Sequence, residues 1–324
     1  MSTKKSYLPN LDLLRVIAAY FVLLYHFRWE GDDPLTFVFK YGYLGVYVFF
    51  CISGFITPLA MQWSNYSIRD WKKFLISRFF RLYPAFAVIA ILEIILYAWG
   101  GFMGYSYKFD QITLVQVVSN FTWTAEFFKQ DWFVPVFWTL AIEAQFTFVI
   151  LVIYPLLKHR NELVRVATIL ALIIPTYFIG RTPTFFTYSA IFAMGIIVFC
   201  KHNKSIDIFT YFGLMFVAAF CSAEGISYYW TTPALFTALF ITFVPQLHAR
   251  LIPYFGKFAY SFFLIHITFG GAALFHLRVL PEQWYFQLLR VFLASVVSFF
   301  AAWVFYYRVE KPFHEYSRRF KAKK

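Results

Sequence analysis

The first long apolar segment of the chain, residues 11–27, carries an arginine and a histidine eleven positions apart. Eleven residues make about three helical turns, so Arg15 and His26 share one helix face and lie roughly 16 Å apart along its axis. Ionisable side chains in a membrane-length helix are costly unless they face protein or a water-filled cavity. The segment therefore predicts a functional stripe at three- and four-residue steps, formed by Asp12, Arg15, Ala19, Val22 and His26.

The composition indicates an integral membrane protein. Hydrophobic residues make up 61% of the 324 residues and charged residues 14%, whereas a soluble domain carries about 25% charge. We expect an all-α bundle of about ten transmembrane helices in a single domain, 1–324, with a short basic tail at about 309–324. The expected helices are 11–28, 42–62, 75–98, 134–157, 164–180, 184–200, 208–224, 229–245, 258–276 and 286–308.

The distribution of basic residues predicts the orientation of the helices. Ten crossings put both termini on one side of the membrane. If the loops near 63–74, 158–163, 201–207 and 246–257 share that side, it holds 22 of the 29 Lys and Arg. The positive-inside rule then makes it the cytoplasm. The net charge of +13 follows from this loop bias, so we expect no nucleic-acid partner. His26 then lies near the outer surface.

Segment 71–84, WKKFLISRFFRLYP, carries a second set of cations. Arg78 and Arg81 are three residues apart on one helix face, inside the apolar stretch, and guanidinium groups suit phosphate. We expect them to bind a polyphosphate ligand that enters from the cytoplasm. Lys72 and Lys73 fit better as anchors at the lipid headgroups.

Other polar residues of apolar segments are further candidates. Glu143 is an intramembrane carboxylate that either orients a histidine or pairs with an arginine. Ser53, beside the helix-packing residue Gly54, and His266 are candidates to line the same cavity, although His266 fits a satisfied core histidine equally well. We expect Glu310 to pair with a cytoplasmic arginine or lysine. The three cysteines show no metal-ligand spacing, so no metal site is expected.

The motifs of the chain resemble a known family. The segments LDLLRVIAAYFVLLYHF, GYLGVYVFFCISGF, SRFFRLYP, FWTLAIEAQF, YSFFLIH and VEKPF occur in this order. They are similar to the bacterial membrane acyltransferase family 3, which includes O-acetyltransferases of lipopolysaccharide O-antigen and other envelope glycans. The resemblance implies a ten-helix enzyme of the bacterial inner membrane, multi-pass, with both termini cytoplasmic. Longer relatives carry an extra helix and a fused hydrolase domain beyond the part that this chain resembles.

The resemblance also implies roles for the candidate residues. The donor is cytoplasmic acyl-CoA, most often acetyl-CoA, used as a substrate rather than as a permanently bound cofactor. The acceptor is a hydroxyl of a saccharide or lipid-linked glycan. Arg15, Arg78 and Arg81 match arginines that would hold acyl-CoA, and His26 and Glu143 match catalytic positions. We expect His26 to act as general base, with Glu143 stabilising its imidazolium form.

Two readings remain open beside this one. Direct transfer and transfer through a covalent histidine intermediate both fit the same residues. A transporter of a sugar or anionic metabolite would also use intramembrane Arg, His and Glu, although the sequence shows no internal repeat.

Overall fold

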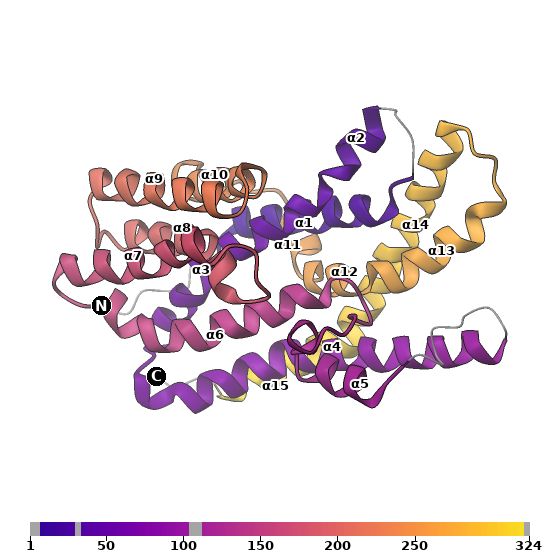
Figure 1. The fold of residues 1–324 in the computed structure, drawn as a ribbon, viewed down its shortest axis with the longest axis horizontal. Coiled ribbons are helices and arrows are strands. Elements are labelled where there is room, and N and C mark those ends of the chain that lie inside the picture. Colours follow the sequence, from indigo (N-terminus) through magenta and orange to yellow (C-terminus); the bar gives the residue numbers. More distant parts are fainter. Residues whose placement is uncertain (1–6, 30–33, 104–111, 321–324) are drawn as a thin grey trace.

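The computed structural model describes residues 7–29, 34–103 and 112–320, and within these ranges it is a bundle of helices without strands (Figure 1). Nine helical stretches of the described chain are long and apolar enough to cross a membrane. The helices are α1 (Pro9–Phe27), α2 (Pro34–Lys40), α3 (Gly45–Trp63), α4 (Trp71–Phe102), α5 (Leu114–Phe121), α6 (Phe137–Leu157), α7 (Glu162–Ile179), α8 (Phe185–His202), α9 (Ile208–Gly225), α10 (Tyr228–Phe243), α11 (Leu251–Gly256), α12 (Ala259–Ile265), α13 (Gly271–His276), α14 (Trp284–Phe305) and α15 (Lys311–Ser317).

All ten expected segments are helical, and the differences from expectation are local. The segment expected at 229–245 is α10. With 16 residues it is too short to count among the nine helical stretches that could cross a membrane. Helix α4 begins at Trp71 and continues through Pro84, an interior proline of the kind that membrane helices tolerate. The expected basic tail contains α15, which packs against α4, with the Phe80 and Tyr316 rings 4.9 Å apart.

Two of the long helices contain a turn of π-helix. The first π-turn, His266–Gly270, separates α12 from α13, and the second, Tyr306–Glu310, joins α14 to α15. A π-turn inserts an extra residue into a helix and often occurs at functional sites. Each of these turns places one buried ionisable side chain, His266 in the first and Glu310 in the second.

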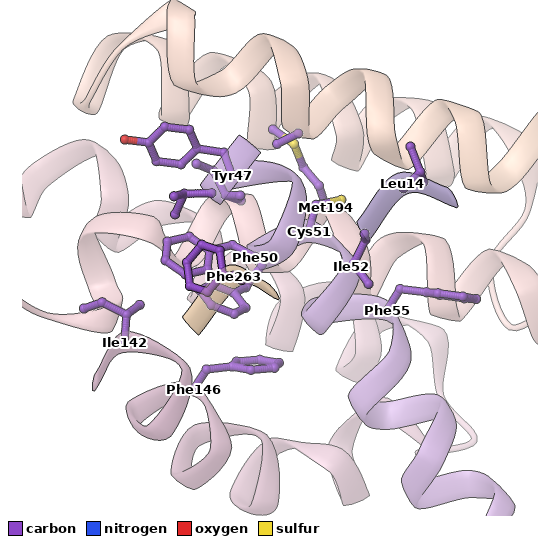
Figure 2. Close-up of a cluster of buried hydrophobic side chains, with 14 of the residues drawn as sticks. Leu14, Tyr47, Phe50, Cys51, Ile52, Phe55, Ile142, Phe146, Met194 and Phe263 are labelled. Atoms are coloured by element: carbon purple, nitrogen blue, oxygen red, sulfur yellow. The ribbon is translucent and has the colours of Figure 1, made fainter. Parts of the chain in front are cut away.

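Helix α3 lies in the middle of the bundle, against α1, α8 and α10 (Figure 1). It approaches α8 closely because both helices present glycine at their crossing. A Cβ atom at Gly54 would lie 2.0 Å from the Phe192 carbonyl oxygen, and one at Gly195 would lie 2.0 Å from the Cys51 carbonyl oxygen. The expected packing role of Gly54 is thereby confirmed. Large side chains of α3, α6 and α8 fill the surrounding core (Figure 2).

Hydrogen bonds join one set of connections at the end of the bundle that holds Tyr7 and Phe320. The Asn10 side chain donates to the carbonyl oxygens of Val244 and Pro245, both at 3.1 Å. Gln62 donates to Asn203 at 2.8 Å, and Arg165 donates to the carbonyl oxygen of His159, between α6 and α7, and to that of Ser205, between α8 and α9. The connections that we assigned together to one side of the membrane therefore do lie together.

The long connection between α4 and α6 is organised by one buried asparagine. Asn120, on α5, accepts from the Phe133 backbone N–H at 2.9 Å and donates to the Asp131 carbonyl oxygen at 3.0 Å. Tyr83 of α4 donates to the Phe121 carbonyl oxygen at 3.1 Å. This part of the connection is thus a short helix tied to α4 and to the segment that precedes α6.

Candidate functional site

Three helices meet at the guanidinium group of Arg78. Its Nη2 atom forms an ion pair with Glu143 Oε1, and its Nη1 atom donates to Thr57 Oγ1 at 3.0 Å. Arg78 lies on α4, Glu143 on α6 and Thr57 on α3. Glu143 and Arg78 expose 15% and 17% of their side chains, so the pair is shielded but reaches an open space.

That open space consists of two adjoining cavities. The inner cavity has a volume of about 160 Å³ and lies between α1, α3, α4, α6 and α12. The terminal cavity has a volume of about 490 Å³ and is lined by residues near both ends of the chain, including Tyr7 and Phe320. Both cavities are lined by Arg15, Arg78 and Arg81. The three arginines, far apart in sequence, therefore surround a single junction.

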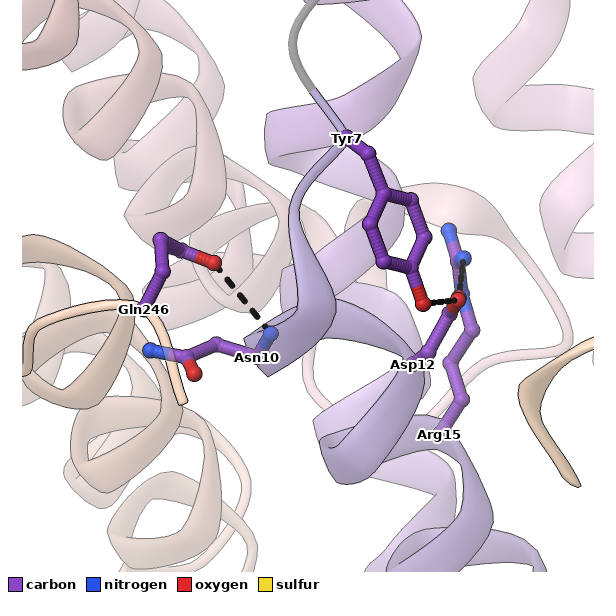
Figure 3. A network of polar contacts seen from close by, with 5 residues as sticks. All are labelled: Tyr7, Asn10, Asp12, Arg15 and Gln246. Atoms are coloured by element: carbon purple, nitrogen blue, oxygen red, sulfur yellow. Dashed lines mark hydrogen bonds and ion pairs between the residues drawn. The ribbon is translucent and has the colours of Figure 1, made fainter. Parts of the chain in front are cut away.

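Arg15 is held by its own helix (Figure 3). Its Nη1 atom pairs with Asp12 Oδ1 at 3.2 Å, and the Tyr7 hydroxyl donates to Asp12 Oδ2 at 2.7 Å. Gly256 of α11 faces Asp12 so closely that a Cβ there would lie 2.5 Å from the Asp12 Cβ. Asp12 thus holds the Arg15 guanidinium in position without lining either cavity, whereas Arg15 lines both.

The wall of the inner cavity combines aromatic rings with a second carboxylate. Phe49 and Phe263 lie with their rings 5.2 Å apart. Glu310 accepts from the Ser261 hydroxyl at 2.5 Å and from its backbone N–H at 3.2 Å. Arg81 lines the same cavity. The expected partner of Glu310 was a cation, but its hydrogen bonds come from Ser261, because the second π-turn brings the carboxylate against the start of α12.

A pair of histidines lies one helical turn beyond Phe263. The rings of His26 and His266 are 5.3 Å apart between centroids. His266 is fully buried, and its Nδ1 atom lies 2.7 Å from the Phe263 carbonyl oxygen. His26 is partly exposed, and Tyr25 packs edge-on against it at 5.0 Å. Helix α12 therefore carries part of the inner cavity wall, and the π-turn that follows it carries His266.

The structure brings together most of the residues that the sequence singled out. Arg15, Arg78, Arg81, Glu143 and Ser53 line the inner cavity. Asp12 does not line either cavity but forms the ion pair with Arg15. His266 lies beside His26 instead of among the residues that line the cavities. Lys73 pairs with Asp70 at 3.2 Å and lines the terminal cavity, and Lys72 lies over the Trp71 ring.

The expected contact between Glu143 and His26 is wrong. Glu143 pairs with Arg78, the other alternative that the sequence left open. The predicted stripe on α1 is also not an open path from Arg15 to His26, because Ala19 and Val22 are packed against neighbouring helices and each expose only 1% of their surface. Val22 is covered by α3, where a Cβ at Gly45 would lie 3.1 Å from Val22 Cγ2.

One further carboxylate was not identified from the sequence. Glu93 of α4 is buried and accepts a hydrogen bond from the Thr268 hydroxyl, in the first π-turn. The signal was available, since Glu93 interrupts the apolar run AILEIIL in the same way that Glu143 interrupts its own segment. Thr57 carried no such signal, because a threonine in an apolar helix is ordinary.

The comparisons with known proteins identify the class. Residues 8–307 match a family model described as an acyltransferase domain, and the chain belongs to this family. A Staphylococcus aureus (strain COL) protein named as a candidate O-acetyltransferase is 35% identical over 153 residues, which is 44% of this chain and 24% of that protein.

Two other relatives extend the comparison. The peptidoglycan O-acetyltransferase OatA of Listeria monocytogenes is 35% identical over 95 residues, 28% of this chain and 14% of that protein. A candidate acetyltransferase of Acidianus two-tailed virus is 28% identical over 182 residues, 56% of this chain and 51% of that protein. The chain thus spans about a quarter or less of the bacterial relatives and about half of the viral one. No solved structure matches the chain.

Proposed function

We propose that this protein is a membrane O-acyltransferase that moves an acyl group, in the first instance acetyl, from cytoplasmic acyl-CoA to a hydroxyl of an envelope saccharide or lipid-linked glycan. The observation that carries the proposal is the junction of Arg15, Arg78 and Arg81 between two cavities, the inner of which is lined by Phe263, one helical turn before the histidine pair. Membership of an acyltransferase family and the names of the relatives support the reaction class.

The arginine junction suits the donor. Coenzyme A carries phosphates at one end and a thin pantetheine arm that ends in the thioester. Arg81 presents a planar donor fork that suits phosphate, and Arg78, whose Nη atoms are bonded to Glu143 and Thr57, adds its positive charge at the same junction. The terminal cavity adds Lys73 and Arg318 to its lining and has the larger volume, so it is the place for the nucleotide end. The narrower inner cavity then directs the pantetheine arm towards Phe263.

The histidine pair suits the transfer step. His26 takes the proton from the acceptor hydroxyl as that oxygen attacks the thioester carbonyl carbon. The new C–O bond forms, the C–S bond breaks, and the proton passes from the imidazolium to the departing thiolate, which leaves as coenzyme A. A covalent acyl-histidine intermediate would use the same residue and the same proton balance.

The acceptor is proposed as a saccharide at the outer face of a bacterial inner membrane. The name of the Listeria relative gives peptidoglycan, a glycan, as its acceptor. With the termini in the cytoplasm, His26 stands at the opposite end of α1. A transporter has less support, because the named relatives are acetyltransferases.

The proposed function is tested with purified protein and radiolabelled acetyl-CoA. We expect label to pass to envelope glycan, and we expect His26→Ala to lower turnover about 10²–10⁴-fold, the usual contribution of a general base, while the protein still inserts. Arg81→Ala should weaken acetyl-CoA binding about ten- to a hundredfold, since a hydrogen bond to a charged group is worth about 1.5–3 kcal/mol. Normal turnover by folded His26→Ala would remove His26 from the reaction.

A further inference from the structure

The tautomer of His266 follows from its one hydrogen bond. Its Nδ1 atom lies 2.7 Å from the Phe263 carbonyl oxygen. A carbonyl oxygen only accepts, so Nδ1 carries the hydrogen, and a neutral imidazole then has a bare lone pair on Nε2. The rings of Phe27, Phe262 and Phe263 surround this side chain at centroid distances of 6.1–6.3 Å, and such apolar surroundings favour the neutral form.

The Nε2 atom of His266 is a buried acceptor without a hydrogen-bond partner among the described residues. Leaving a buried polar atom unpaired is costly, so a folded protein that keeps one calls for an explanation. The side chain is 0% exposed, so bulk water does not supply the missing partner. A group that donates a hydrogen bond during function would supply it.

His26 is the donor within reach. The two rings are 5.3 Å apart between centroids with an interplanar angle of 47°, a separation close to one hydrogen-bond length plus two ring radii. Among the described residues no hydrogen bond engages His26, so none has to break when its ring turns into line. Catalytic hydrogen bonds are often misaligned in a structure without substrate and tighten when substrate binds.

The surrounding structure holds His266 in place for this contact. Thr268 donates to the buried Glu93 carboxylate of α4, which fixes the first π-turn from the side. Gly270 packs directly on Phe27 and Ser298, where a Cβ would lie 2.2 Å from each. Phe27 follows His26 in the sequence, so the same contact fixes the end of α1 against the turn that carries His266.

We propose that His266 is a positioning residue whose Nε2 atom accepts a hydrogen bond from the ring N–H of His26, and so sets the tautomer and the orientation of the base. The proposal rests on the proposed function. The other nitrogen of His26 is then the one that faces the acceptor hydroxyl and takes its proton. When His26 becomes an imidazolium, its N–H bond to His266 becomes charge-assisted and stronger.

His266 thus takes the place that a carboxylate holds in a Ser-His-Asp triad, where a third group orients the base. Glu143 does not fill this place, since it is paired with Arg78. A neutral acceptor has a physical advantage here, because it adds no charge among the aromatic rings around His266 while His26 is neutral.

Two amide variants separate positioning from a structural role. Asparagine at 266 keeps a donor near the Nδ1 position, and so the tie to Phe263, but has no group at the Nε2 position. Glutamine brings an amide oxygen near the Nε2 position and can accept from His26. We expect His266→Asn and His266→Leu to lower kcat about 10–100-fold, the usual effect of losing a partner that orients a functional histidine. His266→Gln should retain more activity, and KM for acetyl-CoA should stay unchanged in all three.

The exposed His276, ten residues further along, provides the matched control. His276→Gln should leave kcat and KM unaltered. Normal kcat in His266→Leu, or normal kcat in His266→Asn with loss in His266→Gln, would overturn the proposal, because the residue would then be dispensable or would act only through Phe263.

A spectroscopic measurement tests the histidine pair without relying on activity. In protein labelled with ¹⁵N-histidine, nitrogen resonances distinguish the two tautomers. We expect His266 to carry its proton on Nδ1 and its Nε2 resonance to move when His26 is replaced by alanine. A protonated Nε2, or an Nε2 resonance unaffected by His26→Ala, would overturn the pairing. If no variant or native protein transfers acetyl while the resonances behave as expected, the proposed function fails and the histidine pair stands.

Discussion

At the scale of residues, each arginine of the junction lies near an acid. Arg15 pairs with Asp12, Arg78 pairs with Glu143, and Arg81 shares the inner cavity with Glu310. A charge in a low-dielectric bundle is costly without a partner. Asp12 and Glu143 therefore hold Arg15 and Arg78 in position before any anionic ligand arrives, whereas Arg81 has no acid bound to it among the described residues.

The Arg78–Glu143 pair gives a prediction that separates stability from ligand binding. We expect Arg78→Ala to lower the free energy of unfolding by about 3–5 kcal/mol, because it leaves Glu143 shielded and unpaired. The double variant Arg78→Met with Glu143→Gln should recover most of that stability but should still bind acetyl-CoA weakly. Thermal melting and acetyl-CoA titration on the same preparations measure both effects. Normal affinity in the double variant would make the pair purely structural.

At the scale of elements, two close contacts set the geometry. The first is the crossing of α3 and α8, where backbone meets backbone at Gly54 and Gly195. It places the α3 residues Ser53 and Thr57 against the inner cavity and Arg78. The second is the first π-turn, which interrupts the α12–α13 helix and holds His266 beside α1.

A glycine pair tests the first contact. We expect Gly54→Ala to destabilise the protein by about 1–3 kcal/mol, the range for overpacking a tight core, because the new Cβ would lie 2.0 Å from the Phe192 carbonyl oxygen. Gly213 on α9 is the matched control, since nothing lies within 4 Å of a Cβ there. Gly213→Ala should be neutral or slightly stabilising. Equal melting temperatures for the two variants would contradict the close approach.

Asn120 tests the tie between α5 and α6. Asn120→Ala removes the acceptor of the Phe133 N–H, and a buried donor left without a partner costs about 1–3 kcal/mol. Asn120→Asp keeps this acceptor but turns a carboxyl oxygen towards the two carbonyl oxygens that the amide bonded, so we expect it to lose stability while still protecting the Phe133 amide. Hydrogen exchange at the Phe133 amide reports the local effect. A Phe133 amide equally protected in native and alanine proteins would show that Asn120 is dispensable there.

At the scale of the whole molecule, the bundle separates two chemical environments. The cations that suit phosphate gather near both chain ends, whereas His26 lies at the opposite end of α1. Between them, Phe49 and Phe263 line the inner cavity with their rings 5.2 Å apart, and Phe263 lies one helical turn before His266. The acyl group would have to cross this aromatic wall, so we expect transfer to require movement of these side chains.

The orientation in the membrane is open to a direct test. The three native cysteines are buried, so added cysteines report their own positions. If the end of the bundle that holds the terminal cavity faces the cytoplasm, Glu282→Cys should react with an impermeant reagent in intact cells. Glu162→Cys should then react only after the cells are permeabilised. Both glutamates are exposed, which makes them a matched pair. Labelling of both from outside would contradict an arrangement in which the acyl group crosses the membrane. The loop at Asp32 and Asp33 and the end 321–324 lie outside the described residues.

Local pattern was enough to predict the class and the cations. The backbone N–H and C=O groups of a long apolar run find hydrogen-bond partners in a bilayer when the run is a helix. The helical segments could therefore be placed from sequence to within a few residues. Arg15, Arg78, Arg81 and Glu143 were recognisable because an ionisable group in such a run is expensive and needs a reason.

Only the tertiary structure decided which of these groups are partners. A helix specifies which side chains share its own face, but a pairing such as Glu143 with Arg78 depends on how α4 and α6 are rotated and offset against α3, which no local spacing encodes. The same holds for His26 and His266, 240 positions apart. Their approach depends on the π-turn and on the packing of Gly270 against Phe27, features that arise when the helices meet. The sequence by itself therefore determined the helices and their costly residues, and the packing of the helices decided what each of those residues touches.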